Sequence, residues 1–141
     1  MLKPVEEREE RLLQLQFIKN NLQSSLNFTF KRQDKIRKSR EYSELKAYGK
    51  VFRSKRLVFN YQQSEHSRLG VIVTKKVGNA VIRNRVKRWI REVFRLHKEV
   101  FRSPLELVII PRSSDLSYNH IKRDFLFFAE KYNEKIYNND N

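Results

Sequence analysis

The stretch from residue 81 to residue 100 constrains the fold of this chain more than any other. Wound as a helix of about 3.6 residues per turn, it gathers its large apolar side chains on one side: Val86, Trp89, Ile90, Val93 and Leu96, with Phe94 at the edge. The opposite side is polar and basic, with Asn84, Lys87, Arg88, Arg91 and Arg95, and it is flanked at its boundary by Arg83 and Arg85. We call these seven residues the cationic ridge. Because such a helix must bury its apolar side, the sequence predicts a helix docked on a sheet with its cations facing outward.

The charge of the whole chain indicates what the cationic ridge binds. The 141 residues include 31 Lys and Arg against 16 Asp and Glu, a net charge of +15, and residues 1–30 contribute none of this excess. Glu92 is the only acid between Lys75 and Arg95. Because like charges this dense repel one another until a polyanion neutralises them, the charge implies nucleic acid or an anionic membrane surface. No stretch approaches the ~20 apolar residues of a spanning helix, and the amphipathic residues 5–24 lack a basic polar face, so we expect nucleic acid and no membrane.

The apolar patterning along the chain predicts an α+β fold. Helices are expected over residues 5–24, 39–49 (Ser39 as N-cap, Gly49 as the stop), 81–100 and 117–136, and strands over 51–53, 56–62, 68–75 and 105–111. The polar residues 62–67 suit a hairpin connection. The order α-β-β-β-α-β-α then forms a two-layer α-β sandwich. We expect one basic, nucleic-acid-binding domain over residues 31–141, preceded by a helical extension, residues 1–30, whose role the sequence does not indicate.

The segment Lys75–Arg88 (KKVGNAVIRNRVKR) carries a resemblance to a known family. It resembles the signature of the bacterial ribonuclease P protein family, including the Arg-Asn-Arg core at residues 83–85. The resemblance extends from about Lys35 to Tyr132: Asp34–Gly49 is similar to the first helix of the family, Arg68–Val71 to the strand before the signature, and Leu107–Arg112 to the last strand.

This resemblance implies an activity as well as a fold. The family fold has a left-handed β-α-β crossover around the signature helix. The protein is then a subunit of the ribonuclease P ribonucleoprotein, the endonuclease that removes the 5′ leader of precursor tRNA, with catalysis carried by the RNA subunit and Mg²⁺ bound mainly by that RNA. The expected partners are ribonuclease P RNA and precursor tRNA, and the expected location is the cytoplasm. Residues expected at the RNA are Lys75, Lys76, Arg83, Asn84, Arg85, Lys87, Arg88, Arg91 and Arg95.

The resemblance also implies a cleft for the single-stranded leader between the first helix of the domain and the sheet. The residues assigned to it are Tyr42, Lys46, Tyr61 and Arg68. Tyr42 is suited to stacking on a base, but it equally fits a half-buried core aromatic. Two aromatic positions of the family are replaced here by Lys46 and Asn60, so electrostatic attraction is expected to carry more of the leader binding.

Other functions are less consistent with the sequence. A ribosomal or ribosome-associated RNA-binding protein has similar size and basicity, and the uninterrupted signature over 75–88 separates the two. A self-sufficient nuclease needs clustered carboxylates for metal ions, whereas the acids here are scattered and His66, His97 and His120 are isolated. We therefore assign no catalytic and no metal-binding residue. No helix-turn-helix or zinc motif supports DNA binding, and the absence of Cys fits a reducing compartment.

Overall fold

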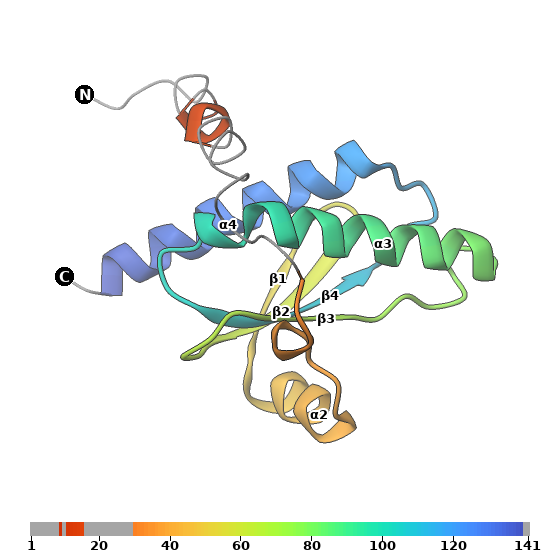
Figure 1. Cartoon of the computed structure of the whole chain (residues 1–141), viewed down its shortest axis with the longest axis horizontal. Coiled ribbons are helices and arrows are strands. Elements are labelled where there is room, and N and C mark those ends of the chain that lie inside the picture. The colour runs from red at the N-terminus through yellow and green to blue at the C-terminus, as the bar shows by residue number, and fades with distance from the viewer. Residues whose placement is uncertain (1–8, 10, 16–29, 140–141) are drawn as a thin grey trace.

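The computed structural model describes residues 9, 11–15 and 30–139, and it contains an α+β domain (Figure 1). Its elements are η1 (Arg32–Asp34), α2 (Ser39–Tyr48), β1 (Lys50–Arg53), β2 (Leu57–Gln63), β3 (Arg68–Val71), α3 (Ala80–His97), η2 (Lys98–Val100), β4 (Leu105–Pro111) and α4 (Tyr118–Asn139). Residues 9 and 11–15 are helical, and we call them the N-terminal helix. The rest of the helix expected over 5–24, and the linker after it up to residue 29, lie outside the described residues.

The four strands form one sheet in the order β1-β2-β4-β3. β2 is antiparallel to β1 and to β4, while β3 is parallel to β4, so α3 makes the β3-α3-β4 crossover. The prediction of a hairpin between β2 and β3 is wrong, because β4 lies between these two strands in the sheet. β4 carries apolar residues on both of its faces: Leu107 and Ile109 lie on one face and Val108 on the other. A strand that is apolar on both faces is most stable in the middle of a sheet.

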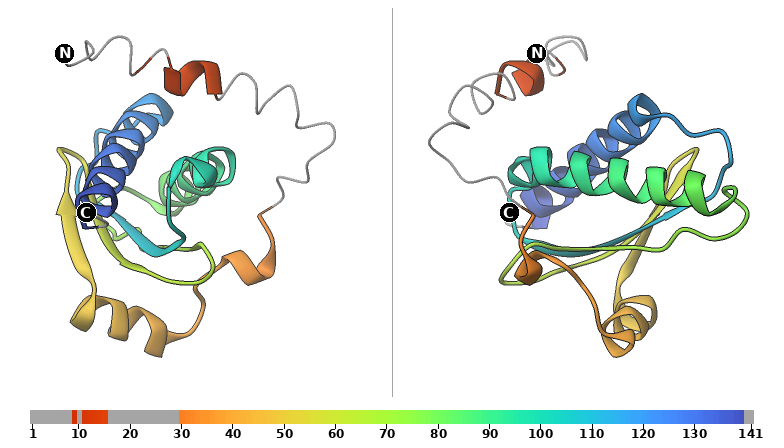
Figure 2. Two further views of the ribbon diagram at one scale, coloured as in Figure 1. Left: turned by 90° about the vertical axis from the view of Figure 1, so that its left-hand side faces the viewer. Right: turned by 45° about the vertical axis from the view of Figure 1, so that its right-hand side comes forward.

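The two faces of the sheet carry different layers. α3 and α4 cover one face and form with the sheet the main α-β sandwich, while the short α2 lies on the other (Figures 1 and 2). The core between α3, α4 and the sheet is aromatic, with Phe59 stacked on Phe128 at 4.5 Å between ring centroids. A smaller cluster of Ile36, Leu45 and Val108 fixes α2. We call the sheet surface that bears α2 the α2 face.

Most element boundaries agree with the sequence within a few residues. The expected strand over 68–75 ends at Val71, although the N–H of Ile72 still donates to the Ile109 carbonyl at 3.1 Å. Ser39 is the first residue of α2 and Lys38 is the N-cap, with no side-chain cap, whereas Gly49 ends the helix as expected. Within the part of the chain that the structure describes, no helix is long and apolar enough to cross a membrane.

Candidate nucleic-acid interface

α3 is positioned by its first turn and by its apolar side. The Asn79 side chain accepts a hydrogen bond from the Ile82 N–H at 3.0 Å and so caps the helix. Gly78 has φ +151°, and a Cβ there would lie 3.0 Å from the Ile82 side chain. Only glycine fits this turn without strain. The turn over Thr74–Gly78 thereby places the two exposed lysines, Lys75 and Lys76, directly before α3.

The apolar side of α3 packs as the sequence predicts. Val86, Ile90, Val93 and Phe94 are fully or almost fully buried, and Trp89 is half-buried against the same core. Trp89 is therefore a core residue, as its place on the apolar side indicated. His97, the last residue of α3, is a structural residue of the helix: it is 3% exposed, and its Nδ1 lies 2.8 Å from the Val93 carbonyl.

The cationic ridge lies on the side of α3 that faces away from the core. Asn84, Arg85, Arg88 and Arg91 are exposed, and Arg83, Lys87 and Arg95 are half-buried. In residues 30–139, no carboxylate forms an ion pair with any of the ridge cations from Arg83 to Arg91. The Arg83 Nε is also buried with no acceptor among the described residues. The ridge therefore presents uncompensated positive charge and unused donors, the combination that binds phosphates.

Arg95 differs from the rest of the ridge. Its guanidinium forms an ion pair with Glu92 one turn earlier, with Nε 3.2 Å from Oε2. The hydrogen bond to Glu92 raises the pKa of Arg95 above its ordinary value. These two residues line a hollow of about 380 Å³ together with Phe30, Asn84, Lys87, Arg88 and Arg91. We therefore expect Arg95 to contribute less than Arg88 or Arg91 to binding a polyanion.

On the α2 face, Tyr42 joins α2 to the sheet. Its hydroxyl donates to the Ile36 carbonyl at 3.0 Å, and its ring lies so close to Gly70 that a Cβ there would be 2.7 Å from the ring. Burial raises the pKa of Tyr42 above 10.0. Tyr42 is half-buried, so both interpretations of the sequence stay open: a half-buried core aromatic, and a ring that stacks on a base of the leader. Lys46, one turn later, is exposed.

Arg68 is held by several partners on the same face. Its guanidinium forms ion pairs with Glu41 of α2 and, at 3.4 Å, with Glu106 of β4, and Nη2 donates to the Lys35 carbonyl at 3.0 Å. All three charged side chains are less than a quarter exposed. The charge of Arg68 is therefore balanced inside the protein. Sequence reasoning missed this arrangement because Glu41, Arg68 and Glu106 belong to three separate elements.

The assignment of Tyr61 to the leader cleft is corrected by the structure. Tyr61 is 4% exposed and packs edge-on against Phe128 and Tyr132 in the core beneath α4. Because side chains of a strand alternate between the two faces, its neighbour Asn60 lies on the α2 face instead. Asn60, which stands where the family has an aromatic residue, therefore lies on the α2 face, and no aromatic ring of β2 lies on that face.

The acidic and histidine side chains of the described residues are mostly engaged in structural contacts. Asp34 is 3% exposed, accepts a hydrogen bond from the Lys31 N–H and lies 2.9 Å from His66 Nε2. Asp124 accepts a hydrogen bond from Ser54 Oγ at 2.7 Å, which ties α4 to the β1–β2 turn. Among the described residues, no three His, Asp or Glu side chains form a group suited to hold a metal ion.

Comparisons with known proteins relate this chain to one protein family. The family model named Ribonuclease P matches residues 30–133. The ribonuclease P protein component of Syntrophus aciditrophicus is 41% identical over 112 residues, which cover 77% of this chain and 94% of that protein, and the one of Dictyoglomus thermophilum is 33% identical over 74% and 92%. The solved structure of the RNase P protein from Thermotoga maritima superposes with a TM-score of 0.62 at 28% identity, over 69% of this chain and 96% of that chain. The one from Staphylococcus aureus gives 0.59 at 29% identity, over 73% and 94%.

Proposed function

The chain belongs to the ribonuclease P protein family and acts as a protein component of that ribonucleoprotein, and on this premise we propose how its two surfaces divide the work. The cationic ridge of α3 binds the ribonuclease P RNA. The α2 face receives the single-stranded 5′ leader of precursor tRNA. The RNA subunit, with Mg²⁺ bound mainly by it, carries out the cleavage that gives the mature 5′ end, and the complex works in the cytoplasm.

The observation that carries this proposal concerns the ridge cations other than Arg95, which have no counter-charge among the described residues. Arg83, Arg85, Lys87, Arg88 and Arg91 meet no carboxylate within the described residues. Each phosphate that such a cation contacts releases condensed counterions, and this release favours binding. Guanidinium groups also grip phosphate oxygens in pairs. A folded RNA subunit with closely spaced phosphates satisfies the whole ridge at once.

The support for leader binding comes from the α2 face. Tyr42 presents an aromatic ring at the junction of α2 and β3, and Lys46 projects an exposed cation one turn away. A ring stacks on any base and a lysine attracts any phosphate, so the pair suits a leader of variable sequence. Asn60, in place of an aromatic, leaves fewer stacking surfaces, so leader binding depends more on charge.

The role of the protein in cleavage is then to bind and to position. Two carboxylates at the α2 face, Glu41 and Glu106, are paired with Arg68, so they stabilise the fold and are poor candidates for holding catalytic ions. The protein lowers the repulsion between two RNAs and raises substrate affinity, and both effects reduce the Mg²⁺ concentration that cleavage needs.

Reconstitution tests the proposal directly. Purified protein, a bacterial ribonuclease P RNA and labelled precursor tRNA are combined at low Mg²⁺, and each component is also tested alone. We expect correct 5′ maturation only when protein and RNA are present together. Cleavage by the protein alone would contradict RNA catalysis, and tight RNA binding without stimulated cleavage would contradict the assigned role.

The leader assignment has its own test. Tyr42→Ala and, separately, Lys46→Ala should weaken the binding of precursor tRNA to the reconstituted complex and leave mature tRNA unchanged. Lys46 is exposed, so its variant folds even where Tyr42→Ala disturbs α2. Exposed Ser43→Ala on the same helix is the matched control. Equal losses for precursor and mature tRNA would exclude a leader contact.

A further inference from the structure

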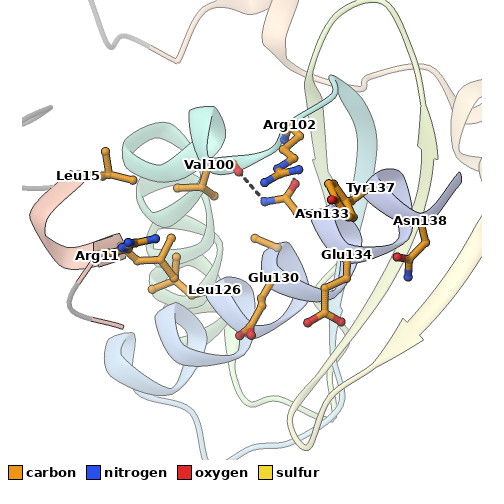
Figure 3. Close-up of a pocket in the computed structure, with 12 residues that line it drawn as sticks. Arg11, Leu15, Val100, Arg102, Leu126, Glu130, Asn133, Glu134, Tyr137 and Asn138 are labelled. Atoms are coloured by element: carbon orange, nitrogen blue, oxygen red, sulfur yellow. Dashed lines mark hydrogen bonds between the residues drawn. The ribbon is translucent and has the colours of Figure 1, made fainter. Parts of the chain in front are cut away.

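The N-terminal helix lies over α4, on the side of the α3–α4 layer that faces away from the sheet (Figure 2, left). A cavity of about 610 Å³ separates it from α4 and η2. Leu12 and Leu15 line this cavity from the N-terminal helix, and Val100, Leu126 and Ala129 line it from the domain. Figure 3 shows Leu15 on the N-terminal helix beside Val100 and Leu126, with Asn133 of α4 hydrogen-bonded to the Val100 carbonyl at 2.8 Å.

Charges on the two sides of this contact are complementary. Arg11 lines the same cavity as Glu130 and Glu134 of α4. A second cavity of about 810 Å³ is lined by Glu9, by two acids of the domain, Asp124 and Glu130, and by four cations of the domain, which we call the second basic patch: Arg53, Lys55, Lys122 and Arg123. In the sequence, Glu9 belongs to a run with Glu6, Glu7 and Glu10. The N-terminal helix therefore places its leucines at an apolar groove, Arg11 near the acids of α4, and Glu9 near the second basic patch.

This helix is an addition to the family domain. The family match begins at residue 30, and the relatives from Syntrophus and Dictyoglomus are covered over 94% and 92% of their length by only 77% and 74% of this chain. The groove on α4 is thus closed in this chain by a segment that precedes the region shared with the family. Its charge also differs from the domain, since residues 1–30 are neutral while residues 31–141 carry the whole +15.

We propose that the N-terminal helix is an intramolecular cover for the outer side of α4, and that its acids lower the affinity of the second basic patch for RNA. The leucines hold the helix in the groove, and the opposite charges fix its direction. The Glu9 carboxylate, which lines the same cavity as Arg53, Lys55, Lys122 and Arg123, reduces the local positive potential that attracts phosphates. RNA is then directed to the cationic ridge, which the cover leaves exposed.

A second copy of the chain is the competing occupant of this groove. Leu13 and Leu15 line the two cavities and are still 56% and 53% exposed, so the N-terminal helix has apolar surface available to another copy. The charge pattern favours the cover within one molecule, because Arg11 and Glu9, two residues apart, each line a cavity with residues of opposite charge on the same chain. Cross-links within one molecule and cross-links between two molecules distinguish these arrangements.

Cross-linking in the full chain tests the contact, since the protein has no Cys of its own. Leu12→Cys combined with Leu126→Cys, and independently Leu15→Cys with Val100→Cys, are treated with a short bismaleimide. We expect cross-links within one molecule at a yield that does not change on dilution. The matched control pairs Leu12→Cys with Tyr48→Cys, which lies at the end of α2 and should not react. Cross-linked dimers, or no cross-link at either pair, would overturn the proposal.

RNA binding tests the shielding and does not depend on ribonuclease P activity. In the full chain, Glu6, Glu7, Glu9 and Glu10 are changed to Gln, and binding to poly(U) is measured across salt concentrations. We expect a several-fold tighter affinity and a steeper salt dependence, by about 0.7 in the logarithmic slope for each additional phosphate that the protein neutralises. A matched variant with Glu44, Glu65, Glu99 and Asp115 neutralised raises the net charge equally and should bind poly(U) less tightly than the quadruple Gln variant.

Adding Lys122→Ala and Arg123→Ala to the quadruple Gln variant completes the test. The increase in poly(U) affinity should shrink to about half or less, because two of the four cations that the acids had shielded are gone. An increase that persists in full, or a quadruple variant that binds no better than the matched control, would show that the acids do not shield this patch.

Discussion

The cationic ridge of α3 and the α2 face both carry arginine, yet Arg88 and Arg91 of the ridge and Arg68 of the α2 face differ in whether their charge is balanced inside the protein. On the ridge, Arg88 and Arg91 meet no carboxylate among the described residues, whereas on the α2 face Arg68 is bound by Glu41, Glu106 and a carbonyl. An arginine whose charge is balanced inside the protein holds elements together, and an arginine without a partner is available to another molecule. A count of basic residues does not distinguish the two.

The largest expected effect is on RNA affinity, when arginines of the cationic ridge are replaced. Changing Arg83, Arg85 and Arg88 to Ala together should weaken binding to ribonuclease P RNA by on the order of 100-fold at about 0.15 M salt, because the protein then neutralises about three fewer phosphates. The slope of affinity against salt should also fall. Filter binding over a salt series measures both, with Arg102, Lys131 and Lys135, on or beside α4, changed to Ala as the control. Unchanged affinity and slope would contradict the assignment of the ridge.

The second prediction concerns the α2 face. Arg68→Met should lower the free energy of unfolding by about 2 kcal/mol, because Glu41 and Glu106 are left partly buried without a counter-charge. Urea denaturation measures this loss. Changing both glutamates to Gln in the Arg68→Met background should restore most of it. Absence of that rescue would mean that Arg68 acts through packing alone.

The third prediction concerns the turn before α3. Gly78→Ala should cost about 1–2 kcal/mol of stability, because the positive φ and the Ile82 side chain both oppose a Cβ. The measurement is again urea denaturation, with Ser43→Ala on the exposed side of α2 as the control. A neutral effect would indicate that the turn adopts another conformation.

The fourth prediction separates the hydroxyl of Tyr42 from its ring. Tyr42→Phe removes the hydrogen bond to the Ile36 carbonyl and should cost about 1 kcal/mol, while the ring against Gly70 remains. Affinity for ribonuclease P RNA, measured beside stability, should not change. A loss of RNA affinity equal to that of the ridge variant would contradict the proposal that the ridge, and not the α2 face, binds the ribonuclease P RNA.

The smallest expected effect depends on pH. Burial raises the pKa of Asp34, but the hydrogen bonds from the Lys31 N–H and His66, together with the charges of Lys98 and His66, outweigh it and leave the pKa below 3.8. A depressed pKa contributes stability that is present above about 3.8 and is lost as pH falls through the folded-state value. Urea denaturation from about pH 7 to about pH 3 should therefore show a steeper loss for the wild-type chain than for Asp34→Asn. Parallel curves would contradict this.

Much of the fold and of the ridge followed from local pattern. The period of the apolar residues in α3 predicted its burial and the position of Trp89, and the family signature predicted the relation to ribonuclease P proteins that the comparisons confirm. The comparisons give no support to the ribosomal alternative. The prediction of a hairpin between β2 and β3 was wrong, because the order of strands in a sheet depends on which strand is apolar on both faces. That can be judged only by comparing all the strands, and the residues around one turn do not reveal it.

The sequence by itself determined which residues share a helix side, because that depends only on spacing along one element. It determined the ridge, the core side of α3 and the basic character of residues 31–141. Tertiary structure alone decided that Arg68 is held by Glu41 and Glu106, that Tyr61 faces α4 while Asn60 faces α2, and that Asp34 meets His66. Each of these depends on register and packing between elements far apart in the chain, and a local pattern carries no information about such contacts.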